Sequence, residues 1–210
     1  EFHEVVKKLP LVVEPDTEWR YSNMGYIMLA ILVEEVSGLT LREYTDKYVF
    51  KPLGMDNTFF ADDAVELIKN RAYGYSKDVD GNYVNDMTNL FVVGDGGLHT
   101  TINDMQKWDA QFYTPKLGKN PETFMEEFML PNSSLPVNPD SGADIFYANG
   151  QGISKSENGL LVSHSGGWLG ANIMYRRYPD NQFMNLVMCS NTSINATNIA
   201  DEIDKWYFNK

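Results

Sequence analysis

The sequence predicts an α+β fold, in which an antiparallel sheet packs with helices and a mainly helical subdomain precedes it. Through most of residues 1–142, apolar side chains recur at helical spacing. From residue 143 onward, short β-type runs alternate with turn formers such as Glu157-Asn158-Gly159 and Pro179-Asp180-Asn181. Short turns favour antiparallel neighbours. We therefore predict a helical subdomain over residues 1–142, and antiparallel strands with a C-terminal helix over residues 143–210.

The first long helix is predicted over Asn23–Ser37. It should stop at Gly38, because glycine readily adopts the left-handed conformation that ends helices. Thr40 and Glu43 have the spacing of a capping box for a short helix, which should end at Lys51-Pro52.

A hairpin is predicted from Tyr73 to Val84, because Asp80-Gly81 accepts the positive φ angles of a tight turn. A bend at Gly94–Gly97 should lead into a helix with Ile102, Met105, Trp108 and Phe112 on one side, followed by a helix over 122–130 and a connection over 131–142.

The strands of the second part are predicted at Ile145–Ser154, Gly159–His164, Gly170–Tyr178 and Gln182–Ser190, and a helix over Ala196–Phe208 closes the chain. In this interpretation Gly166-Gly167 is one of the turns between strands.

The composition excludes several classes of partner. Seventeen basic residues against 29 acidic ones give a net charge of −12, which repels nucleic acid and anionic lipid headgroups. A single cysteine, Cys189, excludes an internal disulfide. His3, His99 and His164 lack the short spacing of a local metal motif. We expect no metal and no other cofactor.

Tyr21-Ser22-Asn23 stands at the start of the predicted long helix. In one interpretation Ser22 or Asn23 simply caps the helix and Tyr21 packs. In the other, Tyr21 offers its phenol to a nucleophile and Asn23 holds a substrate amide. A phenol is a poor base at neutral pH unless positive charge nearby stabilises the phenolate.

His164-Ser165-Gly166-Gly167 ends one predicted strand. Structurally, it is a strand terminus with a Gly-Gly turn. Functionally, His164 and Ser165 could meet a substrate carboxylate, while Gly166 and Gly167 let a substrate backbone approach the strand. The N–H of Gly167 would then be aimed at a developing oxyanion.

Gly94-Asp95-Gly96-Gly97-Leu98-His99-Thr100 precedes a helix, as phosphate-binding loops do. The Lys-Ser/Thr ending of such loops is absent. We therefore predict a structural turn, with His99 as a polar turn residue.

In their order and spacing these motifs resemble the serine β-lactamase and penicillin-binding protein superfamily. The branch that they resemble contains class C β-lactamases, D-alanyl-D-alanine carboxypeptidases and related esterases. Its signatures are S-x-x-K, then Y-x-N, then K-T-G or H-x-G on a strand, and the sister set has S-D-N in the middle. Tyr21-Ser22-Asn23 matches the second signature and His164-Ser165-Gly166 the third. The flanking segments Glu14–Trp19, Pro52–Met55 and Gly96–Thr101 are also similar.

Two features depart from that branch. S-x-x-K occurs nowhere in the sequence. The resemblance implies a β-lactamase/transpeptidase-like fold that is truncated at the N-terminus, with the nucleophile upstream of Glu1. His164 stands where class C β-lactamases usually carry lysine. Because histidine is only partly charged at neutral pH, this favours a D-peptidase, amidase or esterase.

The resemblance implies an acyl-transfer serine hydrolase for a small-molecule or peptide substrate, in an extracytoplasmic location. Tyr21 would shuttle a proton, Asn23 would orient the acyl side chain, and Gly167 would serve the oxyanion hole. This chain alone should be inactive, and its last strand should be prone to edge-to-edge self-association. Two alternatives remain: a non-catalytic ligand-binding protein on the same scaffold, and a structural domain with coincidental motifs.

Overall fold

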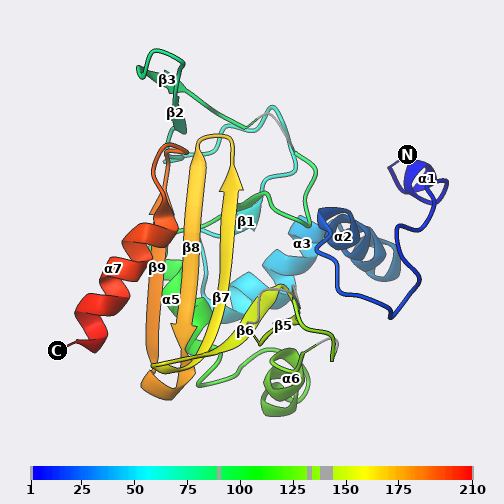
Figure 1. The fold of residues 1–210 in the computed structure, drawn as a ribbon. Helices are drawn as coiled ribbons and strands as arrows, with labels where there is room; N and C mark the ends of the chain where they lie inside the picture. Colours follow the sequence, from blue (N-terminus) through cyan, green and yellow to red (C-terminus); the bar gives the residue numbers. More distant parts are fainter. Residues whose placement is uncertain (1, 89–90, 132–133, 138–143, 210) are drawn as a thin grey trace. The chain divides into compact units, whose positions relative to one another are not determined.

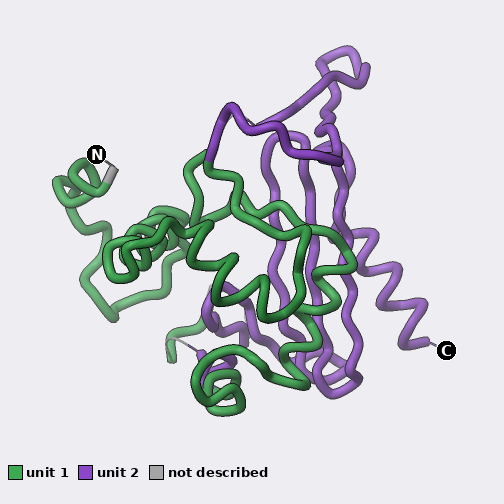
Figure 2. Tube along the Cα trace, turned by 180° about the vertical axis from the view of Figure 1, so that it is seen from behind, with its two compact units in different colours: residues 1–62, 91–126, 133–143 green, residues 63–90, 127–132, 144–210 purple. Residues whose placement is uncertain are grey.

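The computed structural model describes residues 2–88, 91–131, 134–137 and 144–209. Their helices and strands are labelled in Figure 1. Contacts divide the chain into two compact units, coloured separately in Figure 2. Unit 1 comprises residues 1–62, 91–126 and 133–143, and unit 2 comprises residues 63–90, 127–132 and 144–210. The subdomain boundary between residues 142 and 143 stays a prediction; by contacts, residues 63–90 and 127–132 group with the C-terminal strands. Each unit is described by itself.

Unit 1 is mainly helical. Its elements are α1 (Phe2–Val6), α2 (Asn23–Ser37), α3 (Leu41–Thr45), the π-helical turn η1 (Asp46–Phe50), α4 (Lys51–Leu53), a short β1–β4 pair (Phe59–Phe60 with Leu98–His99), α5 (Ile102–Ala110) and most of α6 (Pro121–Phe128). No single described helix is long and apolar enough to cross a membrane. The helix α2 and residues 41–53 together are long and apolar enough for a membrane span, but the chain bends by 76° between them.

Both ends of α2 and the start of α3 are those that the sequence predicts. The side chain of Ser22 accepts from the N–H of Gly25, and Gly38 ends α2 with a φ of 70°. Thr40 and Glu43 form the complete capping box. The predicted stop at Lys51-Pro52 is wrong, because the helical path continues to Leu53. Pro52 begins a new turn, α4, where a missing backbone N–H costs nothing.

A buried carboxylate, Asp104, anchors α5 within unit 1. It accepts from the N–H of Asn57 at 2.7 Å, from the Thr58 hydroxyl at 2.9 Å and from Lys107 at 3.0 Å. Nearby, an apolar cluster is formed by Phe50, Leu53, Met55 and Leu117. The Gly94–Gly97 bend is a structural turn, as predicted: Gly97 accepts from the N–H of Ala61, and His99 lies on β4, stacked on Phe59.

Unit 2 is built on a five-stranded antiparallel sheet with strand order β5-β6-β7-β8-β9 (Figure 1). The strands are β5 (Ile145–Ala148), β6 (Gln151–Ser156), β7 (Gly159–Trp168), β8 (Ala171–Tyr178) and β9 (Phe183–Cys189), with the 3₁₀ turn η3 (Pro179–Asn181) between the last two. The predicted hairpin at Asp80-Gly81 is confirmed as β2 (Tyr75–Lys77) and β3 (Tyr83–Asn85).

Two strand predictions are wrong. The run predicted as one strand over Ile145–Ser154 is a hairpin, because Asn149 and Gly150 form a two-residue turn with φ angles of 46° and 89°. Asn-Gly is the preferred pair for such turns. Gly166-Gly167 is no turn: β7 continues to Trp168, and the chain reverses at Leu169-Gly170, where Gly170 has a φ of 65°.

The helix α7 (Ala196–Phe208) packs against β8 and β9, as Figure 1 shows. Its apolar contact is made by Ala196 and Ala200 with Met174 and Val187. One turn further along, Asp204 accepts hydrogen bonds from Arg176, Tyr178 and Asn185, which stand on the strands. The helix is therefore joined to the sheet by both apolar and polar contacts.

The β7–β8 turn is joined to the segment around β2 and β3 by a hydrogen bond and by close backbone packing. The N–H of Gly170 donates to Asp86 at 2.9 Å. The backbones of Gly74 and Gly170 approach so closely that no side chain fits between them. Tyr75 bonds to the chain after β9 by donating to the carbonyl of Ser190 and accepting from the N–H of Thr192.

Candidate active site

The Y-S-N motif lies at the start of α2, in unit 1. The Ser22 side chain is used by the helix cap, where it accepts from the N–H of Gly25 at 3.0 Å. Tyr21 is 53% exposed and its ring lies 6.4 Å from that of Trp19. Asn23 is exposed as the first residue of α2. The capping role is thus confirmed for Ser22. The cap uses the side chain of Ser22 and not that of Tyr21 or Asn23.

The H-S-G-G motif lies in unit 2, within β7. His164 pairs with Tyr175 of β8 and Gly167 pairs with Asn172 in an unbroken register. The motif is therefore a regular strand segment and not a strand terminus. Tyr21 and Asn23 belong to unit 1, whereas the H-S-G-G motif belongs to unit 2.

One backbone edge of β7 is left without a strand neighbour. The β6–β7 register ends at Gly152 and Ser163, whereas β7 continues to Trp168. No strand in the described part of unit 2 pairs with β7 beyond Ser163 on that side. We call this segment, from His164 to Trp168, the open edge.

The direction of the backbone groups at the open edge follows from the register. The two-residue turn closes on Trp168 and Ala171, so the N–H and C=O of Trp168 face β8. The N–H of Leu160 also points to that side, where it donates to Asp180. Backbone groups of successive residues alternate between the two edges. Those of Ser165 and Gly167 therefore face the open edge.

Neighbouring side chains of the motif lie on opposite faces of the sheet, because strand side chains alternate. Ser165 pairs with Met174, which packs on α7, so its side chain points to the face that carries α7. His164 starts from the other face. Within β7, the two side chains therefore start on opposite faces of the sheet. A substrate carboxylate could contact both His164 and Ser165 only if it lies at the open edge, between the two faces of the sheet.

Both ring nitrogens of His164 have a polar contact. Its Nδ1 lies 2.6 Å from the carbonyl oxygen of Ser165, and its Nε2 lies 3.2 Å from the hydroxyl of Tyr147 on β5. The Tyr147 and His164 rings meet edge to face at 6.2 Å. Sequence reasoning missed Tyr147, because it lies in a run predicted as plain strand and belongs to no local motif.

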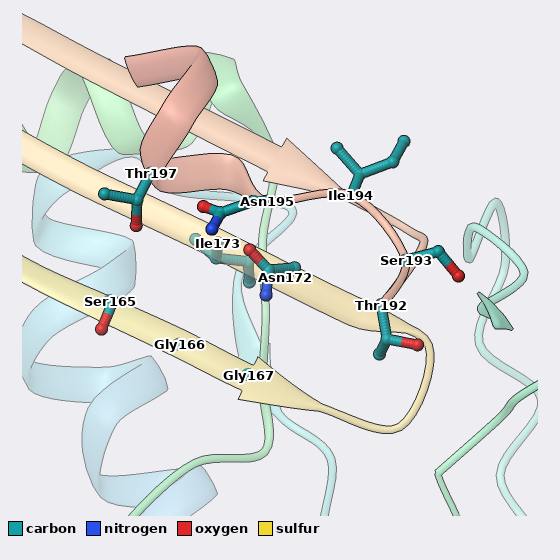
Figure 3. Close-up of a pocket in the computed structure, with 10 residues that line it drawn as sticks. All are labelled: Ser165, Gly166, Gly167, Asn172, Ile173, Thr192, Ser193, Ile194, Asn195 and Thr197. Atoms are coloured by element: carbon teal, nitrogen blue, oxygen red, sulfur yellow. The ribbon is translucent and has the colours of Figure 1, made fainter. Parts of the chain in front are cut away.

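On the face that carries α7, a shallow pocket of about 390 Å³ lies beside Ser165. Figure 3 shows its lining residues: Ser165, Gly166, Gly167, Asn172, Ile173, Thr192, Ser193, Ile194, Asn195 and Thr197. Hydroxyl and amide groups dominate this lining, and none of these residues carries a charge. Asn172 holds the start of α7 by accepting from the N–H of Ala196 at 2.8 Å. The pocket can offer neutral hydrogen-bond donors to a ligand.

Among the residues that the structure describes, no group of three His, Cys, Asp or Glu side chains is arranged to hold a metal ion.

Comparison with known proteins connects both motifs to one family. A family model described as Beta-lactamase matches residues 1–204. Penicillin-binding protein 4* of Bacillus subtilis is 32% identical over 182 residues, which cover 80% of this chain and 39% of that protein.

Solved structures agree on the fold. The penicillin binding protein from Bacillus halodurans superposes with a TM-score of 0.80 at 24% identity, covering 98% of this chain and 62% of that one. The octameric penicillin-binding protein homologue from Pyrococcus abyssi superposes with a TM-score of 0.83 at 25% identity, covering 95% and 44%. The chain thus spans less than two thirds of each of these relatives.

The predicted α+β fold and the resemblance are both confirmed by these comparisons. The match extends over nearly the whole chain and includes both motifs in their expected order. This chain belongs to the beta-lactamase family.

Proposed function

We propose that this chain is part of a serine hydrolase that forms an acyl-enzyme with an amide or ester substrate. A serine of an S-x-x-K motif outside residues 1–210 attacks the carbonyl carbon, and the leaving group departs with a proton. Water then attacks the acyl-enzyme and restores the serine. The observation that supports this most directly is the open edge of β7, because it presents the N–H of Gly167 where no described strand of unit 2 pairs with it.

Gly167 would stabilise the oxyanion through this N–H. The bare surfaces of Gly166 and Gly167 let a substrate backbone lie against the strand, since no atom of another residue lies within 4 Å of a Cβ built at Gly167. His164 would meet a substrate carboxylate at the open edge, and Ser165 would meet one from the pocket on the face of α7.

Tyr21 would shuttle the proton together with the lysine of S-x-x-K, and Asn23 would orient the acyl side chain. The exposure of both at the start of α2 supports these roles. The substrate would be a D-peptide, a β-lactam or a small ester, and no cofactor would be required. An extracytoplasmic location, which the family resemblance implies, is part of this proposal.

The self-association predicted for the last strand concerns the outer edge of β9. The alternation that applies to β7 directs the backbone groups of Met184, Leu186 and Met188 away from β8. No strand among the described residues pairs with that edge. We propose that another segment or a second copy of the chain pairs there, and the octameric relative is consistent with the second copy.

The test compares the 210-residue chain with the intact protein of the same gene, using a chromogenic ester and nitrocefin. The intact protein should turn over at least one substrate, and the chain alone should not, because removing one member of a cooperating catalytic set costs orders of magnitude in rate. Equal turnover by the purified chain would contradict the proposal.

Variants of the intact protein test the roles. Tyr21→Phe should lower kcat/KM by about 10²- to 10⁴-fold, as the loss of a proton-transfer group does. Tyr48→Phe makes the same chemical change at a half-exposed tyrosine of unit 1 outside the motifs, and should leave kcat/KM unchanged. If the intact gene carries no S-x-x-K and the protein binds ligands without turnover, the alternative of a non-catalytic binding protein is favoured.

A further inference from the structure

The hydrogen bonds around His164 determine which nitrogen of its ring carries the proton. A carbonyl oxygen can only accept, so the contact of Nδ1 with the carbonyl of Ser165 requires a proton on Nδ1. In the neutral imidazole Nε2 is then an acceptor. The hydroxyl of Tyr147, 3.2 Å away, must donate to it.

The position of Tyr147 allows it to act on this ring. It stands on β5 opposite Gly152 of β6, which in turn pairs with Ser163 of β7 next to His164. The two rings also meet edge to face, which favours one orientation of the imidazole beside the hydroxyl. Tyr175 of β8 is the register partner of His164.

We infer that Tyr147 is a positioning residue for His164: it holds the imidazole at the open edge in the Nδ1–H form. The tautomer of His164 is a property of the folded chain and does not depend on the proposed function. Only the effect of Tyr147 on substrate binding rests on that function. If His164 meets a substrate carboxylate, a ring held by two hydrogen bonds has less conformational freedom to lose on binding. Tyr147 would then act on substrate binding through His164.

The first experiment needs no substrate. Nitrogen-15 NMR of the imidazole rings at alkaline pH reports which nitrogen carries the proton, and His164→Asn identifies the signals of His164 beside those of His3 and His99. The wild-type chain should show His164 with the proton on Nδ1. A proton on Nε2 would overturn the inference without any variant.

Tyr147→Phe keeps the ring and removes only the hydroxyl. It should move part of the His164 population to the Nε2–H form, because only the Ser165 carbonyl then favours the proton on Nδ1, whereas isolated histidine favours it on Nε2. Tyr83→Phe removes a hydroxyl from the exposed β2–β3 hairpin of the same unit and should leave the spectrum unchanged. Identical His164 signals in wild type and Tyr147→Phe would show that the hydroxyl positions nothing.

The second experiment measures hydrolysis by the intact protein. Tyr147→Phe should raise KM for a carboxylate-bearing substrate by about 2- to 10-fold, the effect of one lost hydrogen bond, with a smaller change in kcat. KM for a matched ester without the carboxylate should not change. An equal rise for both substrates would overturn the positioning role. If neither substrate is hydrolysed, the proposed function fails, while the NMR result still decides the role of Tyr147.

Discussion

Arg176 of β8 and Asp204 of α7 form a largely buried ion pair, with Nη1 of the guanidinium 2.6 Å from a carboxylate oxygen. The same carboxylate accepts from the hydroxyl of Tyr178 at 2.7 Å and from the amide of Asn185 at 2.8 Å. Burial and the hydrogen bond to Asp204 both raise the pKa of Tyr178, so the phenol keeps the proton that it donates. One side chain of α7 therefore satisfies three polar groups of the sheet.

Asp204→Ala should lower the free energy of unfolding by about 1.5–3 kcal/mol, because three polar groups of the sheet lose their shared acceptor while Arg176 keeps its ion pair with Asp201. Urea denaturation followed by circular dichroism measures the change. Glu202→Ala removes a carboxylate from an exposed pair on the same helix and should change stability by less than about 0.5 kcal/mol. Equal losses in both variants would show that the Asp204 cluster adds nothing to the docking of α7.

Asp104 should make the stability of unit 1 dependent on acid pH. Burial raises the pKa of its carboxyl, but hydrogen bonds from Lys107, Asn57 and Thr58 outweigh burial and bring the pKa below its ordinary 3.8. A folded-state pKa that is depressed stabilises the fold above about pH 4, and this stabilisation is lost as pH falls through the folded-state pKa.

The variant Asp104→Asn should cost roughly 1.5–3 kcal/mol at neutral pH, the contribution of hydrogen bonds to a charged group. The difference from wild type should shrink as pH falls from about 4 through the folded-state pKa of Asp104, because the carboxyl then becomes protonated and both side chains are neutral. Denaturation at several pH values measures it, with the exposed Asp95→Asn as the control. A difference that stays constant down to acid pH would exclude the ionised carboxylate as its cause.

Gly170→Ala should destabilise unit 2 strongly. A methyl group there would overlap the carbonyl oxygen of Asp86 and the backbone of Gly74, and Gly170 has a positive φ as well. We expect a loss of more than about 2 kcal/mol in thermal or urea unfolding. Gly167→Ala, on the same hairpin, meets no atom within 4 Å and should stay within about 0.5 kcal/mol of wild type. Similar stability of the two variants would contradict the close packing at the turn.

Hydrogen exchange should alternate along β9 in a dilute monomeric sample of the chain. The amides of Met184, Leu186 and Met188 face away from β8 and should exchange faster than those of Asn185 and Val187, which bond to it. Raising the protein concentration should protect the outer set if copies of the chain pair there. Strong protection of all amides in the monomer would show that the edge is covered from within the chain.

Local signals predicted the helix ends and hairpins that depend on a few neighbouring residues. Ser22, Gly38 and the Thr40–Glu43 box act within one helical turn, so the sequence contains their whole explanation. The same holds for Asp80-Gly81. The turn at Asn149-Gly150 had an equally clear signal, which the sequence interpretation overlooked.

Other features depend on partners that are distant in the sequence. Gly166-Gly167 has the composition of a turn, but pairing with Ile173 and Asn172 keeps it extended. The Tyr147 contact exists because β5 and β7 flank the same strand, and no spacing rule predicts it. The motifs therefore identified the strand of the candidate site but not the side chains around it.

The position of the Asn149-Gly150 turn sets the length of the β5–β6 hairpin. It therefore also sets how much of β7 is left as the open edge. The register between β6 and β7 advances residue for residue and stops at Gly152 and Ser163. Two more paired residues at the start of β6 would oppose Ser165, and four would oppose Gly167. A small insertion beside this turn would thus close the site with backbone alone and leave every residue of the H-S-G-G motif in place.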